Sequence, residues 1–352
     1  MENLKEGLFG EFEKQKASII LYPYRDDIWR DNCGPIAEMM INLGKAIAEF
    51  EPVILGVIPE LVETVKAKYD LPANMKIVEM KYNDIWTRDS ISAVVRNGNG
   101  LEIPVFGFNA YGERLYKPFD DDDKISEHVA KMFGYKFHRS PLILEGGNLM
   151  TDGNQTIFCV EDALLNPNRN PGKTREEIEE ILKKETLSKK VIWIPHGVVN
   201  DETDGHIDNV IAFADEKTML LSWTDDVNNE HYEAVHDIYE ILKDCTNKDG
   251  EKYNIVKLPI PPLYRRTAED SKGIIEEDGS FARLEGDPIL DTYVNFALVN
   301  GGVIVPQFGI PMDQEALEII KKVFPDRKIV PFYSREASLG GGGLHCLTKH
   351  IN

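Results

Sequence analysis

The sequence lacks four features that would place it in a familiar class of protein. No apolar run approaches the roughly 20 residues of a membrane-spanning helix. The opening MENLKEGLFGEFEKQK has no basic stretch followed by an apolar segment and a cleavage site, so it is not typical of a secretory signal. No Ser/Gly-rich or Pro-rich linker divides the 352 residues. The four cysteines (Cys33, Cys159, Cys245 and Cys346) form no CxxC pair, which argues against a disulfide framework and a structural zinc site. We expect a soluble cytoplasmic protein with free thiols and no membrane partner.

Basic residues are also fewer than acidic residues. The chain has 40 Lys and Arg against 60 Asp and Glu, a net charge of −20, and such a surface repels phosphate backbones. We therefore expect no nucleic-acid partner. Most of this charge is typical of a solvated acidic surface, and we interpret the run FDDDDK at 119–124 in that way, as acids that precede a helix. A cationic substrate is the alternative explanation.

Amphipathic helical patterns alternate with short β-rich runs along the chain. Helices are predicted at 36–50, 59–69, 123–133, 174–186, 229–243 and 313–324. Strands are predicted at 53–57, 76–80, 135–140, 191–195, 253–259 and 328–332, and LTKHIN reads as a further short strand. Cys159 is expected to point into the core from a strand, and Cys245 to lie at a helix end. The alternation indicates the α/β class.

Side chains that can take part in catalysis or binding follow four of the predicted strands. These loops contain KYNDIWTRD, PLILEGGN, HGVVNDETDGHIDN and YSREASLGGGGLHC. If the modules surround an axis, the four loops converge at one end of it. A faint internal repeat supports this arrangement, because DDIWRD at 26–31 resembles NDIWTRD at 83–89.

Cys346 follows a run of four glycines close to the end of the chain. A cysteine reacts as its thiolate, and it usually needs a base or a positive neighbour to reach that form. Glycines let the backbone approach a ligand closely and adopt positive φ angles. The segment GGGGLHC therefore predicts a nucleophilic cysteine on a flexible loop. The alternative is a flexible tail with an incidental thiol.

The segment TDGHIDN places His206 and Asp208 two residues apart, on one face of an extended segment. A histidine beside a carboxylate is a general acid/base whose tautomer and charge are controlled. The same pattern also fits a solvated turn or half of a metal site, although no HxxxH motif or second histidine pair completes such a site.

Two further segments add acids and an aromatic ring. NDIWTRDS holds Trp86 and Asp89, and LEGGN holds Glu145. Each segment alone fits a structural role. Together they offer what a planar guanidinium group needs, which is paired carboxylates at its N–H forks and a ring for stacking.

Several motifs stand in the order and approximate spacing seen in the agmatine deiminase family, a relative of the bacterial peptidylarginine deiminases. They are WTRD, LEGGN followed by Asp152 and Gly153, ALLNPNRNP, DETDGHIDN, SWTDD, YVNF, PDRK and GGGGLHC. The resemblance runs from about residue 18 to the C-terminus. DETDGHIDN and the glycine-rich ending are its most specific parts.

The resemblance implies a fold and a set of catalytic residues. The fold is a five-module, pseudo-symmetric α/β propeller (the pentein fold), a single domain over residues 1–352. Cys346 is the implied nucleophile and His206 the implied general acid/base. Asp89, Glu145 and Asp208 are the implied carboxylates that hold the guanidinium and orient the histidine.

Other residues are expected to bind the substrate. Trp86 offers a stacking ring, and Gly342 and Gly343 let the backbone come close. Agmatine lacks the α-carboxylate of arginine, so a selective site should offer its far end an acid or a carbonyl. By analogy between the two DIW segments, Asp26, Asp27 and Trp29 are candidates for that end.

Three positions depart from the family pattern. Ser90-Ile91-Ser92 stands where the family commonly has Thr-Gly-Pro, Gly343 stands where it commonly has Asn, and Lys349-His350 replaces a usual Gln pair. None of these changes removes a catalytic group. They lie beside the site, however, and leave the identity of the substrate open.

The implied reaction is hydrolysis of agmatine to N-carbamoylputrescine and ammonia through a thiouronium adduct on Cys346, without metal or organic cofactor, in a homo-oligomer (a dimer or larger). Because several carboxylates oppose a second anion, we expect the thiol to stay protonated near neutrality until the cationic substrate binds. The alternatives are a deiminase or amidinotransferase acting on arginine or peptidyl-arginine, a metal-dependent ureohydrolase that uses His206 and Asp208, and an inactive polyamine-binding protein.

Overall fold

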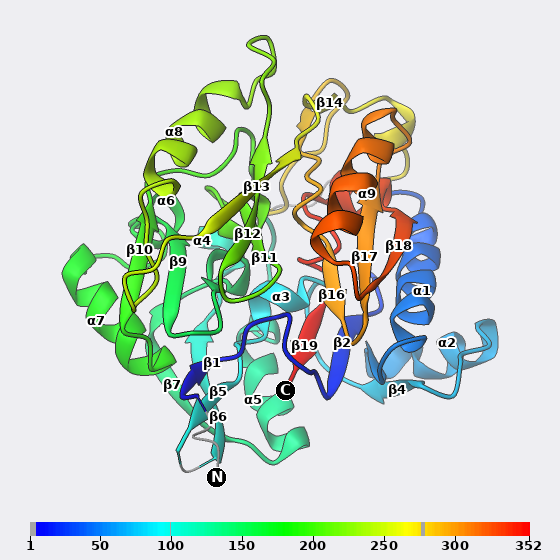
Figure 1. The fold of residues 1–352 in the computed structure, drawn as a ribbon. Helices are drawn as coiled ribbons and strands as arrows, with labels where there is room; N and C mark the ends of the chain where they lie inside the picture. The colour runs from blue at the N-terminus through cyan, green and yellow to red at the C-terminus, as the bar shows by residue number, and fades with distance from the viewer. Residues whose placement is uncertain (1–4, 99, 276–278) are drawn as a thin grey trace.

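The computed structural model describes residues 5–98, 100–275 and 279–352. Within these ranges the chain is a mixed α/β structure of small sheets flanked by helices (Figure 1). The sheets, in strand order, are β19 (Lys349–Ile351), β2 (Ala17–Leu21), β3 (Val53–Val57) and β4 (Met75–Glu79); β1 (Gly7–Leu8), β5 (Val95–Asn97), β6 (Gly100–Gly107) and β7 (Lys136–Ile143); β10 (Lys190–Ile194), β9 (Thr156–Val160) and β8 (Met150–Thr151); β11 (Ile211–Phe213), β12 (Thr218–Trp223) and β13 (Asn254–Pro259); β16 (Ala297–Val299), β17 (Gly302–Gln307) and β18 (Lys328–Tyr333); and the pair β14 (Tyr264–Arg265) and β15 (Pro288–Ile289).

All of these sheets except the β14–β15 pair share one plan. A short strand pairs antiparallel with a central strand, and the central strand pairs parallel with a third strand on its other side. A parallel pair needs a long crossover connection. The crossover helices are α1 (Gly34–Ala48), α5 (Asp122–Phe133), α7 (Arg175–Thr186), α8 (Tyr232–Leu242) and α9 (Met312–Val323), while α2 (Val62–Lys68) links β3 to β4.

The remaining helical elements are short and lie mostly in the connections that carry polar side chains. They are the α-helices α3 (Thr87–Ser90), α4 (Ala110–Glu113), α6 (Glu161–Leu164) and α10 (Arg335–Gly340), and the 3-10 turns η1 (Pro59–Leu61), η2 (Gly146–Asn148), η3 (Ile207–Asn209) and η4 (Glu269–Ser271).

The helices and strands predicted from periodicity are confirmed, with ends that differ by up to three residues. The final strand is confirmed as β19, and Cys159 is fully buried on β9. Of the central strands, β9 was expected only as the strand that carries Cys159, and β2, β6, β12 and β17 were not predicted. They are short, largely buried runs, and such runs carry no two-residue alternation.

The interpretation of FDDDDK as a solvated acidic run is wrong for Asp122, which is fully buried at the start of α5. Its carboxylate accepts hydrogen bonds from the backbone amides of Asn83 and Asp84 and from the hydroxyl of Tyr116. Burial raises the pKa of Asp122 to about 7. This acid therefore fixes the NDIW segment, which leads into the candidate site.

The glycine-rich segment near the C-terminus packs closely against other side chains and is not a flexible loop. Gly340 is the last residue of α10, and a side chain added there would meet the ring of Trp29. Gly341 adopts a φ of 103°, which favours glycine.

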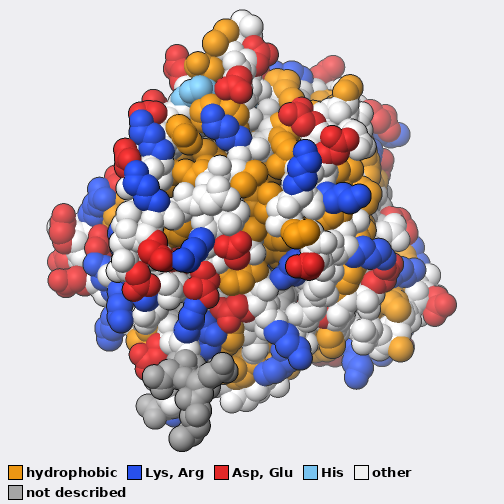
Figure 2. Space-filling model, viewed as in Figure 1, with side chains coloured by type: hydrophobic (Ala, Val, Ile, Leu, Met, Phe, Trp, Pro, Cys, Tyr) orange, Lys and Arg blue, Asp and Glu red, His pale blue; other side chains and the backbone are white. Residues whose placement is uncertain are grey.

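The surface carries both signs of charge. Figure 2 shows Lys and Arg interspersed with Asp and Glu over one face of the molecule. None of the helices in the described ranges is both long and apolar enough to cross a membrane.

Candidate active site

Four loop segments that are far apart in the sequence meet in the structure. They carry Asp89 on α3, Gly147 on η2, His206 and Asp208 at η3, and Cys346 after α10. The backbone amide of Gly147 donates to Asp89 Oδ1 at 2.7 Å. A Cβ atom placed on Gly147 would lie 2.6 Å from His206 Nδ1, 2.7 Å from Asp89 Oδ1 and 3.0 Å from Asp208 Oδ2. The convergence of these loops, expected from the sequence, is confirmed.

Local contacts hold each of these loops in place. The carboxylate of Asp201 accepts from the backbone amide of His206 and from the side chain of Asn209, which folds the DETDGHIDN turn. The side chain of Asn148 exchanges two hydrogen bonds with the backbone of Val160 on β9. Arg88 donates its backbone amide to the carbonyl of Cys346 at 3.1 Å. The WTRD and LHC segments are therefore tied together directly.

His206 is buried beside Asp89, with 3.6 Å between His206 Nδ1 and Asp89 Oδ1. Asp89 also accepts from the hydroxyl of Tyr111 at 2.8 Å. Burial opposes the charged imidazolium, but Asp89, Asp201 and Asp208 outweigh it and raise the pKa of His206. The histidine is thus suited to donate a proton.

Tyr111 reaches Asp89 from a backbone of unusual conformation. Ala110, Tyr111 and Glu113 have φ angles of 48°, 61° and 60°, which non-glycine residues rarely adopt. Such conformations persist only where the surroundings enforce them, and they gather at functional sites.

The thiol of Cys346 is buried among acids and amides. Its Sγ atom lies 3.6 Å from Asp208 Oδ2 and 3.3 Å from Asn295 Nδ2. Burial raises the pKa of this thiol well above its ordinary value, and the charges of Asp208 and Asp89 raise it further. Burial likewise raises the pKa of Asp89. These surroundings therefore favour the neutral thiol.

Glu145 completes the set of acids and is fully buried. Its Oε1 atom accepts from Arg169 Nε at 2.7 Å, and Arg169 is itself held by Asp204. Its Oε2 atom, together with Asp208 Oδ1 and His206 Nε2, has no hydrogen-bond partner among the residues that the structure describes. Buried polar atoms normally have partners, so these three are available to a ligand.

The glycines expected to face a substrate pack against aromatic and amide side chains. A Cβ atom on Gly342 would lie 2.6 Å from the Trp86 ring and 3.2 Å from Cys346 Cβ. One on Gly343 would lie 2.3 Å from Asn295 Oδ1. The structure therefore brings Trp86 beside Cys346, and Asn295 fills the space that a side chain at position 343 would take.

The two DIW segments pack on each other. The rings of Trp29 and Trp86 are 5.5 Å apart, and Trp29 Nε1 donates to Asp84 Oδ1 at 3.0 Å. Both carboxylate oxygens of Asp27 accept from Arg25. A role for Asp27 at the far end of a substrate stays a prediction, and an incoming amine would have to compete with Arg25.

Several residues of the site were not identified from the sequence. Asn295 lies in the YVNF motif, Arg169 in ALLNPNRNP and His345 in GGGGLHC, so these motifs were noticed without roles for the residues. Tyr111 carried no sequence signal. In the part of the chain that the structure describes, no three His, Cys, Asp or Glu side chains are grouped so that they could hold a metal ion.

Comparison with known proteins assigns a family to this arrangement. Residues 8–351 match the model of the Porphyromonas-type peptidyl-arginine deiminases. An agmatine deiminase of Pseudomonas putida is 38% identical over 345 residues, which cover 96% of this chain and 93% of the relative. One from Pseudomonas syringae pv. tomato is 38% identical over 344 residues, which cover 96% and 93%.

Solved structures of related enzymes superpose on this chain over nearly its whole length. An agmatine deiminase of Enterococcus faecalis superposes with a TM-score of 0.94 at 34% identity, covering 99% of this chain and 96% of that chain. An amidinotransferase from Microseira wollei superposes with a TM-score of 0.50 at 12% identity, covering 99% and 97%, and this likeness concerns the fold alone.

The raised pKa of Cys346 predicts slow alkylation at neutral pH. Because only the thiolate reacts, we expect the rate of iodoacetamide labelling of Cys346 to increase with pH through pH 9, about the ordinary thiol range. Mass spectrometry of the Cys346 peptide measures the rate, and Cys346→Ser is the blank. A labelling rate that already levels off near pH 6 would contradict this prediction.

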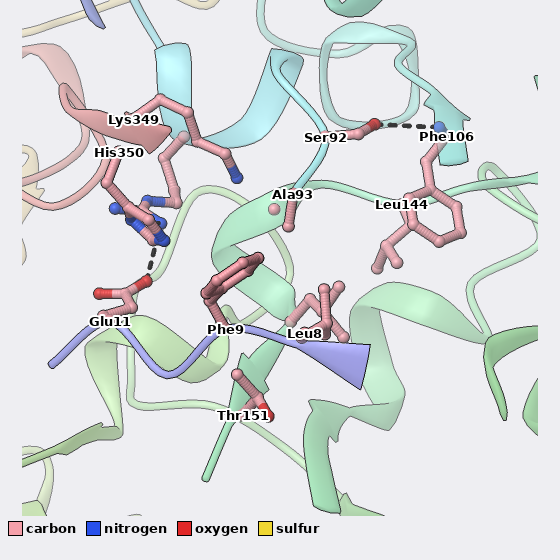
Figure 3. Close-up of a pocket in the computed structure, with 13 residues that line it drawn as sticks. Leu8, Phe9, Glu11, Ser92, Ala93, Phe106, Leu144, Thr151, Lys349 and His350 are labelled. Atoms are coloured by element: carbon pink, nitrogen blue, oxygen red, sulfur yellow. Dashed lines mark hydrogen bonds and ion pairs between the residues drawn. The ribbon is translucent and has the colours of Figure 1, made fainter. Parts of the chain in front are cut away.

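Lys349 gives a second, independent prediction. It is buried on β19 and lines a cavity of about 30 Å³ (Figure 3). Burial, with the charge of Arg88, lowers its pKa from 10.5 to about 7. Between these two values the unfolded chain binds a proton that the folded chain does not, so the contribution of Lys349 to stability rises with pH across this window.

We therefore expect Lys349→Met to raise the melting temperature at pH 7.5, by a gain that shrinks toward pH 10. Differential scanning calorimetry at several pH values measures it. Lys328→Met, which alters an exposed lysine on β18, is the matched control and should change little at any pH. An equal gain at pH 7.5 and pH 10 would show that Lys349 is not buried in its neutral form.

Proposed function

The chain belongs to the Porphyromonas-type peptidyl-arginine deiminase family, and on that premise we propose that it is an agmatine deiminase, which hydrolyses agmatine to N-carbamoylputrescine and ammonia. The relatives that share more than a third of its residues over nearly its whole length carry that name. The solved structure with the TM-score of 0.94 does as well.

One observation carries the proposal from the site itself. Two buried carboxylate oxygens, Glu145 Oε2 and Asp208 Oδ1, and the buried imidazole nitrogen His206 Nε2 have no partner in the described residues. A guanidinium group offers N–H donors in a plane and a positive charge, and it would satisfy both oxygens. An uncharged or anionic ligand would leave the acids without compensation.

The proposed roles follow the geometry. Asp89, Glu145 and Asp208 hold the guanidinium, Trp86 lies along it, and the backbone at Gly342 and Gly343 closes the site beside Cys346. Trp29 and Asp27 stay predicted contacts of the far amine of agmatine, from the analogy between the two DIW segments. The charge of the bound cation lowers the pKa of the Cys346 thiol, and so helps to form the thiolate.

In the first half-reaction the Cys346 thiolate attacks the guanidinium carbon and forms a C–S bond. Protonated His206 gives its proton to one amino group, which leaves as ammonia, so that a thiouronium adduct remains on Cys346. In the second half His206, now neutral, takes a proton from water as the oxygen bonds to the same carbon. The C–S bond then breaks, the thiolate leaves, and the hydroxyl proton is released as the urea carbonyl forms.

We further propose that the three- and four-stranded sheets surround one axis as a five-module propeller, in a single domain over residues 1–352. Their shared plan and the meeting of their connecting loops at Cys346 support this arrangement. A homo-oligomer of two or more subunits and a location in the cytoplasm stay predictions from the sequence.

The reaction is tested by incubating the protein with agmatine and measuring ammonia and N-carbamoylputrescine. We expect Cys346→Ala to lower kcat by at least about a thousandfold, because it removes the nucleophile. Acid quenching of the wild-type reaction should trap an adduct on the Cys346 peptide. Cys159→Ala, which alters a buried thiol in a different hydrophobic cluster from Cys346, is the control.

Three other outcomes would redirect the assignment. Faster turnover of arginine or of a blocked arginine peptide would make the protein a deiminase of those substrates. Urea and putrescine as products, lost with a chelator, would indicate a metal-dependent ureohydrolase. Binding of agmatine without any product would indicate a binding protein.

Gly147 offers a sharper test of the geometry. Its added methyl group would meet His206, Asp89 and Asp208 at 3.0 Å or less, whereas one on Gly34 would meet nothing within 4 Å. We expect Gly147→Ala to lower kcat roughly 100-fold, because displacing the catalytic groups by a fraction of an ångström to one ångström is enough for such a loss. Gly34→Ala should retain activity, and equal activity of the two variants would count against this site.

A further inference from the structure

Behind the catalytic residues, an ion-paired chain runs from the N-terminal segment to Asp208. Arg88 Nη1 donates to Glu11 Oε1 at 2.7 Å. Glu11 lies 2.9 Å from His345 Nε2 through each of its carboxylate oxygens. His345 Nδ1 lies 2.8 Å from Asp208 Oδ2. The chain of contacts ends at Cys346, whose Sγ atom is 3.6 Å from the same Asp208 oxygen.

The geometry favours the charged form of His345. Both of its ring nitrogens face carboxylate oxygens, and a carboxylate accepts hydrogen bonds without donating them. An imidazole that donates from both nitrogens is the cation. The groups therefore alternate in sign, from Arg88 through Glu11 and His345 to Asp208.

Solvent is largely excluded from this chain. The side chains of Arg88 and His345 are each 5% exposed, that of Glu11 is 14% exposed and that of Asp208 is 1% exposed. Figure 3 shows Glu11 and Phe9 on the N-terminal segment, facing Lys349 and His350 around the small cavity. Charges in such surroundings are weakly screened, so each one acts strongly on its neighbour.

Asp208 is thereby held in one orientation. His345 engages Oδ2, the oxygen next to the thiol, and leaves Oδ1 as the unpaired oxygen that a guanidinium can meet. The positive charge of His345 also offsets the negative charge that Asp208 directs at Cys346.

We propose that His345 and Glu11 are positioning residues that act on Cys346 through Asp208 and set the pH range in which the thiol reacts. Their effect on turnover rests on the proposed agmatine hydrolysis, whereas their effect on the thiol does not.

The charges around each group agree with this role. Burial opposes ionisation of Glu11, but Arg88 and His345 lower its pKa well below the ordinary value, and His350 and Lys349 face it as well. Burial and Arg88 oppose the cation on His345, but Glu11 and Asp208 raise its pKa. Asp208, Asp89 and Tyr111 face the thiol.

The test compares His345→Gln, Glu11→Gln and Glu13→Gln. Glu13 lies on the same segment and pairs with Arg96 at 2.8 Å, away from Asp208, so Glu13→Gln is the matched control. The rate of iodoacetamide labelling of Cys346 against pH is measured without substrate. His345→Gln removes the nearby cation and should move the midpoint upward by about one pH unit. Glu11→Gln removes the carboxylate that stabilises the charged form of His345, and should move the midpoint upward by about half a unit. Glu13→Gln should cause no shift.

Agmatine turnover provides the second readout. We expect kcat to fall roughly tenfold in His345→Gln and in Glu11→Gln, with KM within about twofold of wild type, because the reacting groups rather than the binding contacts are altered. If His345→Gln fails to fold, Glu11→Gln carries the test alone. Midpoints that match wild type in every folded variant, or a shift as large in Glu13→Gln, would overturn the proposal. A wild-type protein that does not hydrolyse agmatine would refute the proposed function and leave the alkylation test valid.

Discussion

The arrangement of the candidate site depends on the burial of several carboxylates close to the Cys346 thiol. Carboxylates removed from water and placed near each other repel one another and lose their hydration, so each needs a specific partner. Arg169 donates to Glu145, and His345 pairs with Asp208. Asp89 accepts from a backbone amide and a tyrosine hydroxyl, and it lies beside His206. Among the described residues, one oxygen of Glu145 and one of Asp208 are left without a partner, and we propose that the substrate meets these two atoms.

This constraint explains why the loops are tied so closely to the sheets. A buried carboxylate that moved by an ångström would lose its partner, so the segments that carry these acids are fixed by further buried groups. Asp122 holds the turn that leads to Trp86, Asn148 fastens the EGG loop to β9, and Asp201 folds the turn that carries His206. These three polar residues have no role in the proposed reaction, yet they fix the backbone that carries its residues.

The sequence allowed prediction of elements and loops with a local signal, and not of contacts between distant segments. Amphipathic helices such as α5 and α9 show their period within one window, whereas central strands such as β2 and β17 are short, largely buried runs that could equally belong to helices. Acids in a row look solvated, and only the folded chain shows that Asp122 is buried. Glu11 could not be found at all, because its partner His345 lies 334 residues further along the chain.

If the substrate is a guanidinium, the same charges favour binding of the substrate over binding of the uncharged urea group of the product. Without a bound cation the site favours a neutral thiol and a protonated His206. Burial and the surrounding acids raise the pKa of the thiol, whereas at His206 the acids outweigh burial and raise its pKa. A bound cation reverses the balance at the thiol, so the nucleophile forms mainly when there is something to attack. The urea group of the product carries no charge and cannot compensate the acids, which weakens its binding and lets the thiol recover its proton. The site thus distinguishes substrate from product by charge rather than by shape.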